Sequence, residues 1–146
     1  MSATPSTPAT VPGSLPALAL RALLAPAGVF AAHLFLSLAL NAYKRVGWVD
    51  EAMHLAGGFT IALCFATLLD GLQRMGRIAR PEPWLRGLLI FALTCTAAVL
   101  WEFAEFLSDR WLGTTSQLEL HDTLGDLLMG LLGGLAFVVW SRAPNC

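Results

Sequence analysis

The sequence predicts an all-α polytopic membrane protein, a bundle of four transmembrane helices whose N and C termini both lie in the cytoplasm. Of its 146 residues, 56% are hydrophobic and only 13% are charged, whereas about 25% of the residues of a soluble domain are charged. The hydrophobic residues fall into four runs, each close to the roughly 20 residues that a helix needs to cross a bilayer. These predicted spans are residues 18–42, 50–69, 84–106 and 117–140. The lipid bilayer is therefore the first partner that the sequence predicts.

The composition also limits the domain organisation and the other partners. Residues 1–16 are rich in Ser, Thr, Pro and Ala, which predicts a disordered N-terminal tail before a transmembrane domain at residues 17–142. Residues 143–146 are expected to form a short C-terminal tail. A formal net charge of -1 argues against nucleic-acid binding. A membrane-protein partner or a homo-oligomer stays open, because glycine-rich helix faces can associate in a bilayer.

Local signals predict where two of the helices start. Asp50 is expected to cap the second helix. The fourth helix follows a turn-forming segment and begins with a capping-box pattern, in which Ser116 precedes Glu119 by three residues. This pattern predicts that the fourth helix begins near Gln117. Pro26 lies inside the first span, where neighbouring helices can compensate for the hydrogen bond that proline lacks.

Basic residues predict the orientation of the bundle. The connection between the second and third spans contains Arg74, Arg77 and Arg80. The two opposite connections contain fewer basic residues, namely Lys44, Arg45 and Arg110. Because cytoplasmic connections carry an excess of lysine and arginine, the arginine-rich connection is expected inside the cell. Both termini then lie inside, and the other two connections lie outside.

Acidic residues gather at the predicted outer end. Eight of the ten carboxylates lie there: Asp50, Glu51, Glu102, Glu105, Asp109, Glu119, Asp122 and Asp126. In each of the last three helices, two polar residues share one helix face at an offset of three or four. The pairs are Asp50 with His54, Glu102 with Glu105, and Asp122 with Asp126. Small residues continue these faces towards the bilayer centre and allow close helix approach, so the acids are expected to face one another across the bundle.

This arrangement predicts a metal site with seven candidate ligands. They are His54, Glu102, Asp126, Asp50, Glu105, Asp122 and His121. The first three lie about one helical turn inside the outer surface, where an ionisable group is usually functional. The outermost acids could instead be solvated helix ends, since short connections need polar residues. His33 in the first span is more simply interpreted as a hydrogen-bonded packing residue.

The chemistry of these side chains indicates a divalent metal ion. Clustered carboxylates at low dielectric repel one another unless a cation or shared protons offset their charge. Oxygen and imidazole ligands without thiolates suit Zn, Mn, Fe or Mg. Glu51 and His54 form a Glu-x-x-His sequence, which helical di-iron sites use twice together with two further glutamates. Only one copy occurs here, so the identity of the metal stays open.

The three spaced motifs also carry a resemblance to known families. Asp50-x-x-x-His54, Glu102-x-x-Glu105 and Asp122-Thr123-x-x-Asp126, followed by a glycine-rich stretch, resemble the YjdF-type family of bacterial inner-membrane proteins, which has no established activity. More distantly, the chain is similar to VanZ-like membrane proteins, although Glu105 and Asp126 stand where that family has amides. The first resemblance implies the bacterial cytoplasmic (inner) membrane. The second implies a link to the cell envelope.

Two functions follow from a metal site of this kind. In the first, the bound cation has a non-enzymatic role in structure, sensing or assembly in the cell envelope. In the alternative, the protein is a metal-dependent membrane hydrolase or transferase that acts on a lipid-linked envelope substrate, and an outer carboxylate or His121 serves as general base. The predicted outer connections, about seven and ten residues long, are shorter than most active-site lids. This favours cation binding over catalysis.

Overall fold

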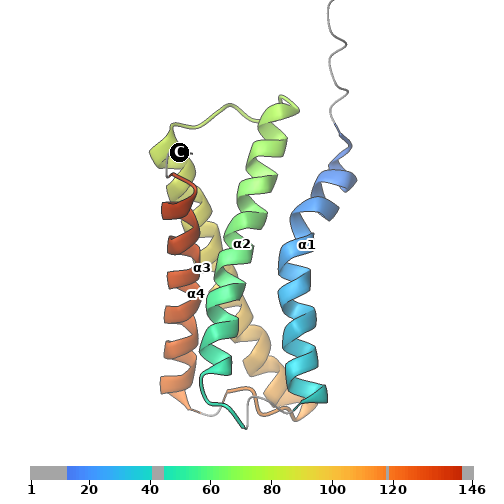
Figure 1. Ribbon diagram of the computed structural model, residues 1–146, viewed down its shortest axis with the longest axis vertical. Helices are drawn as coiled ribbons and strands as arrows, with labels where there is room; N and C mark the ends of the chain where they lie inside the picture. Colours follow the sequence, from blue (N-terminus) through green and yellow to red (C-terminus); the bar gives the residue numbers. More distant parts are fainter. Residues whose placement is uncertain (1–12, 41–44, 118, 143–146) are drawn as a thin grey trace, which may run out of the picture.

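The computed structural model describes residues 13–40, 45–117 and 119–142, and all secondary structure in these residues is helical. The elements are α1 (Leu15–Leu34), the π-helical turn η1 (Phe35–Ala39), α2 (Val49–Arg74), α3 (Pro83–Leu112) and α4 (Leu120–Trp140). Four segments, α1 with η1 and each of the other three helices, are long and apolar enough to cross a membrane. They run side by side as a bundle (Figure 1). The predicted fold class is confirmed, and the orientation of the termini stays a prediction.

The first helix begins earlier than the predicted tail allows. α1 starts at Leu15, because the side-chain oxygen of Ser14 accepts a hydrogen bond from the backbone nitrogen of Ala17 at 3.4 Å and caps the first turn. Pro16 follows in that first turn, where its missing N–H costs nothing. Leu15 and Pro16, the last two residues of the predicted tail at 1–16, are therefore helical. The predicted tail residues 1–12 and 143–146, and span residues 41–42, lie outside the described residues.

Glycines in the left-handed conformation mark the ends of two helices. Gly76 has φ 67°, and the backbone nitrogens of Gly76 and Arg77 donate to the carbonyls of Gln73 and Leu72, the pattern of a Schellman motif. Gly113 has φ 70° and caps α3 in the same region of backbone space. Both helices continue past the predicted span ends at residues 69 and 106. The predicted ends follow the loss of hydropathy, whereas the observed ends follow the residues that tolerate positive φ.

The fourth helix begins later than the capping box predicts, and this prediction is wrong. α4 starts at Leu120, and its N-cap residue Glu119 makes no side-chain capping hydrogen bond. The backbone N–H groups of Ser116 and Gln117 instead donate to the carboxylate of Asp109, at distances of 2.8–3.0 Å. These groups already have an acceptor on α3, so the segment crosses the bundle end in non-helical form. The predicted cap at Asp50 is also absent, because the N-cap position of α2 is Trp48.

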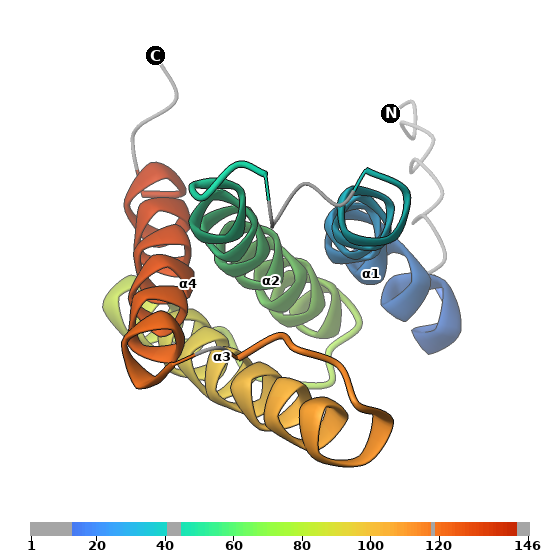
Figure 2. The ribbon, with the colours of Figure 1, turned by 90° about the horizontal axis from the view of Figure 1, so that it is seen from below.

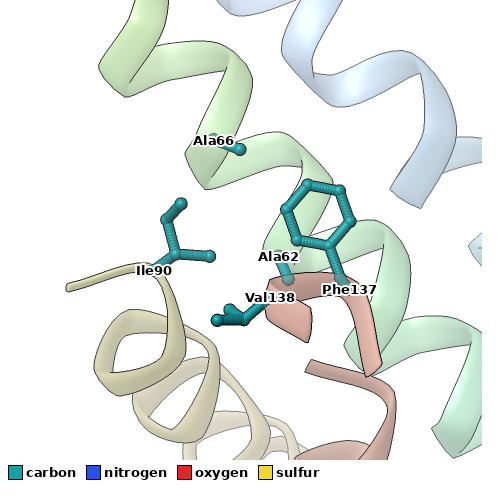
Figure 3. Close-up of a cluster of buried hydrophobic side chains, with 5 residues drawn as sticks. All are labelled: Ala62, Ala66, Ile90, Phe137 and Val138. Carbon is teal, nitrogen blue, oxygen red and sulfur yellow. The ribbon is translucent and has the colours of Figure 1, made fainter. Parts of the chain in front are cut away.

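α2 is the central helix of the bundle. Its backbone approaches those of α1, α3 and α4. In the described part of the chain, the backbone of α1 approaches no long helix except α2. Seen from below, α1 therefore stands apart from α3 and α4 (Figure 2). Buried side chains from α2, α3 and α4 form the apolar core (Figure 3). They are Ala62, Ala66, Ile90, Phe137 and Val138.

Glycine contacts bring α2 and α4 unusually close together. A β-carbon at position 58 would lie 1.9 Å from the carbonyl oxygen of Gly130, and one at position 133 would lie 2.1 Å from that of Leu55. Only glycine permits these distances, because any side chain would enter the opposite backbone. The crossing lies one helical turn below His54 on α2 and Asp126 on α4. It therefore positions both helices for the polar cluster described next.

Candidate metal centre

His54 on α2 is the centre of a polar cluster at the end of the bundle where α2 and α4 begin and α3 ends. Its Nε2 atom lies 3.5 Å from Oδ1 of Asp50 and 3.7 Å from Oδ1 of Asp126. Its Nδ1 atom lies 4.0 Å from Oε1 of Glu102. Glu102 is only 7% exposed and Asp126 only 4%. The three residues that were expected to lie deepest therefore meet across α2, α3 and α4.

Two groups of possible ligand atoms share this histidine. The first contains Asp50, His54 and Asp126, and the second contains His54, Glu102 and Glu105. Within each group the candidate ligand atoms lie within 4.8 Å of one another. The structure thus brings together five of the seven predicted ligands. Four carboxylates surround one imidazole ring.

The two glutamates of α3 are held by hydrogen bonds from neighbouring side chains. Oε2 of Glu102 accepts from the side-chain amide of Gln117 at 3.0 Å, and the same amide donates to the backbone carbonyl of Glu102. Oε1 of Glu105 accepts from the indole nitrogen of Trp101 at 2.9 Å. Each glutamate keeps a second oxygen outside these bonds. Such supporting hydrogen bonds commonly orient metal-ligating carboxylates.

Gln117 is a site residue that sequence reasoning missed. The capping-box pattern assigns it to the first turn of a helix, whereas its side chain contacts Glu102 in the cluster. Asp109 determines this position, since its carboxylate accepts from the backbone of Ser116 and Gln117 and from the hydroxyl of Thr114. The signal in the sequence was an acid in the last turn of α3 followed by polar residues. That signal alone does not specify which carbonyl or carboxylate the amide reaches.

The remaining two predicted ligands lie at the edge of the cluster. His121 is exposed, and Asp122 is half-buried. Neither belongs to the two groups of ligand atoms that the described residues form. Both lie in the first turn of α4, one turn further from the bundle centre than Asp126. The structure therefore leaves His121 and Asp122 outside the inner set of possible ligands.

An apolar cavity of about 160 Å³ lies directly below the cluster. Its walls come from all four helices, and the polar residues in the lining include two threonines and the histidines His33 and His54. The ring of Trp101 contacts Phe30 and His33 of α1 edge-on, with centroids 5.8 and 5.9 Å apart. These side chains bridge α1 and α3 where the two backbones stay apart. His33 is thus a wall residue of the cavity in addition to a packing residue.

The fold and the cluster define a class: a multi-pass membrane protein with an acidic and histidine-containing cluster inside its helix bundle. Residues 14–144 match the family described as predicted membrane protein (DUF2238), and the chain belongs to this family. An uncharacterised protein of Thermotoga maritima is 33% identical over 102 residues, which cover 69% of this chain and 51% of the relative. The chain spans about half the length of this curated relative. No solved structure matches.

Proposed function

We propose that this protein binds a divalent cation between α2, α3 and α4, and that Asp50, His54 and Asp126 are its ligands. The distances from Nε2 of His54 to the two aspartate oxygens, 3.5 and 3.7 Å, carry the proposal. They exceed the usual length of about 3 Å for a hydrogen bond to nitrogen. Tetrahedral ligands bonded to zinc at about 2.0–2.1 Å lie roughly 3.3 Å apart. A small inward movement of these atoms would therefore complete one face of a metal tetrahedron.

Glu102 has a supporting role in this proposal. Metal-bound histidines usually donate their second ring N–H to a carboxylate or carbonyl, which fixes the ring and increases its basicity as a ligand. Nδ1 of His54 faces Oε1 of Glu102 at 4.0 Å, and Gln117 holds the other oxygen of that carboxylate. Glu105 lies in the same group and offers a further oxygen ligand. The identity of the cation stays among Zn, Mn, Fe and Mg, which accept oxygen and imidazole ligands.

The charge of the cluster also favours a bound cation. Four carboxylates share this space with one imidazole, and two of them are almost completely buried. Among the residues that the structure describes, no lysine or arginine forms an ion pair with any of the four. Buried like charges are costly unless protons or a cation offset them. A divalent ion bound by Asp50, His54 and Asp126 would offset two charges and would tie α2 to α4.

The proposed role is non-enzymatic and concerns structure, sensing or assembly in the cell envelope. The arginine-rich connection favours an orientation in which the cluster faces the outside of the bacterial cytoplasmic membrane. The family match is consistent with the YjdF-type resemblance, whereas the comparisons give no support to the VanZ-like one. A partner membrane protein or a second copy of the chain would fit an assembly role.

One observation favours the enzymatic alternative. The apolar cavity beside His54 lies at bilayer depth and could receive part of a lipid chain whose polar group reaches the cation. Three protein ligands with an open fourth position are also typical of catalytic zinc sites. A metal-dependent hydrolase or transferase for a lipid-linked substrate is therefore the second candidate. Its test is exchange of labelled water, or turnover of lipid phosphates, by the metal-loaded protein.

Elemental analysis of the detergent-purified protein tests cation binding. We expect close to one divalent ion per chain in the wild type and strongly reduced metal in the Asp126→Asn variant, because this substitution removes a charged ligand. Glu102→Gln is expected to reduce metal less, since it removes the orienting carboxylate. Glu119→Gln is the matched control, because Glu119 is an exposed acid at the same end of the bundle. Absence of stoichiometric metal from the wild type would contradict the proposal.

Loss of the amide at Gln117 is expected to weaken metal binding without removing a ligand. Substitution of supporting residues typically costs 10–100-fold in metal affinity, and we expect a change of about tenfold in Gln117→Leu. Competition with a coloured chelator in detergent measures it. Thr115→Ala is the control, because Thr115 is an exposed residue of the same segment. Equal affinities in Gln117→Leu and wild type would contradict the supporting role of Glu102 and Gln117.

A further inference from the structure

A second, larger cavity opens at the end of the bundle opposite to His54. Its volume is about 1120 Å³, and its walls come from the C-terminal halves of α2 and α4, the start of α3 and the connection 75–82. The inner wall is apolar and includes Leu63 and Phe137, whereas the rim contains charged side chains and Trp140. Tryptophan at such a level is typical of the interface between lipid tails and headgroups. The cavity therefore lies where headgroups would meet the protein.

The charged side chains of this cavity leave a surplus of positive charge. Arg74, Arg80 and Arg86 line it together with one acid, Asp70. Arg86 donates to both oxygens of Asp70, at 3.0 and 2.9 Å, so these two charges offset each other. Arg74 and Arg80 are exposed and form no ion pair among the described residues. Two guanidinium groups are thus available to an anion at the rim.

A further side-chain donor belongs to the wall of the same cavity. The side-chain nitrogen of Gln73, which lines the cavity, is buried and has no hydrogen-bond partner in the described part of the chain. A buried donor without a partner is rare in folded proteins. This nitrogen has almost no accessible surface, so a rotation of the Gln73 side chain would bring it to the cavity.

We propose that this cavity binds a phosphate group, either in the headgroup of an anionic phospholipid or as free phosphate. Arg74 and Arg80 supply positive charge, and the amide of Gln73, after a rotation of its side chain, donates a hydrogen bond to a phosphate oxygen. Arginine is well suited to this ligand, because its planar donor group matches the geometry of phosphate oxygens. Basic pockets between membrane helices bind lipid headgroups in this way. The site is separate from the His54 cluster and does not depend on a bound metal.

Native mass spectrometry of the full chain in detergent, titrated with phosphatidylglycerol or phosphatidylcholine, tests this proposal. We expect either that phosphatidylglycerol binds more tightly than phosphatidylcholine, or that inorganic phosphate at millimolar concentration binds and competes with the lipid. The Arg74→Gln/Arg80→Gln double variant should weaken binding roughly 25-fold, at about fivefold per basic residue near an anionic headgroup. Gln73→Leu should also weaken binding. Arg77→Gln is the matched control, because Arg77 lies in the same connection and does not line the cavity.

The two sources of phosphate give different results. Selective binding of phosphatidylglycerol that inorganic phosphate does not reduce identifies the lipid headgroup as the ligand. Binding of inorganic phosphate without preference between the two lipids identifies free phosphate. Equal binding of both lipids together with no effect of phosphate overturns the proposal, and this comparison uses wild-type protein alone. A loss in Arg77→Gln as large as in the double variant also overturns it, because the effect would then be general surface charge.

Discussion

The Gly58→Ala variant is expected to force α2 and α4 apart and to disrupt the His54 cluster one turn away. The added β-carbon would lie 1.9 Å from the carbonyl oxygen of Gly130, 2.8 Å from its carbonyl carbon and 3.0 Å from its Cα. All three are backbone atoms, so the contact can be relieved only by moving a helix. Overpacking of this kind typically costs about 1–3 kcal/mol. The separation of His54 from Asp126 should lower metal affinity by at least about tenfold, the change that about 1.4 kcal/mol produces.

The neighbouring glycine provides a matched control. A β-carbon at position 57 would have no atom within 4 Å, so the same chemical change one residue away avoids the clash. We expect Gly57→Ala to unfold at or above the wild-type temperature, since alanine favours helix over glycine. Thermal unfolding in detergent, followed by circular dichroism, and chelator competition measure both effects. Equal behaviour of the two variants would contradict the role of the glycine crossing.

The Asp126→Asn substitution is expected to change stability in opposite directions with and without metal. In the presence of a chelator, the variant should unfold at a higher temperature than wild type, because one of four clustered carboxylates loses its charge. With zinc at 100 times its dissociation constant, the free energy of unfolding of the wild type should increase by about 2.7 kcal/mol. For a protein of this size, that increase raises the unfolding temperature by roughly 5–10 °C. The variant should gain little, so the order of the two unfolding temperatures reverses.

Asp122→Asn separates a ligand effect from a general charge effect. It removes the same charge from the same helix face, but Asp122 lies outside both groups of ligand atoms. We expect this variant to keep most of the stabilisation by zinc, which a zinc titration followed by thermal unfolding measures. A full metal response in Asp126→Asn would show that Asp126 is not a ligand. Loss of the response in Asp122→Asn would move the site towards the rim of the bundle.

Much of the candidate site follows from helical periodicity. The offset of four residues between Asp50 and His54, and the small residues below each acid, predict one polar face on each of three helices. The structure brings those faces together at Asp50, His54, Glu102 and Asp126. The depth of each residue follows from its distance to the end of the hydrophobic run. On this basis Asp126 is predicted to lie inside the bundle and His121 at its rim. The structure agrees, because Asp126 is buried and His121 is exposed.

The start of α4 shows where local reasoning fails. Ser116 and Glu119 fit a capping box. In the structure, however, the carboxylate of Asp109 on α3 accepts hydrogen bonds from the backbone N–H groups of Ser116 and Gln117. A capping box considers only hydrogen bonds within four residues, whereas the observed acceptor is seven and eight residues away. Gln117 consequently reaches Glu102 and becomes part of the cluster. The same limit explains why the pair between Arg86 and Asp70 was not predicted, since it joins two helices.

The sequence by itself determined that this protein is a bundle of four membrane helices with acids and histidines concentrated at one end. Hydropathy and helical periodicity are properties of adjacent residues, so they can be read along the chain. Only the tertiary structure decided that His54 lies at the centre, that Gly58 and Gly130 set the distance between α2 and α4, and that α1 stands apart beside a cavity. These features depend on contacts between distant backbones, because helix approach is determined by which surfaces fit together in space.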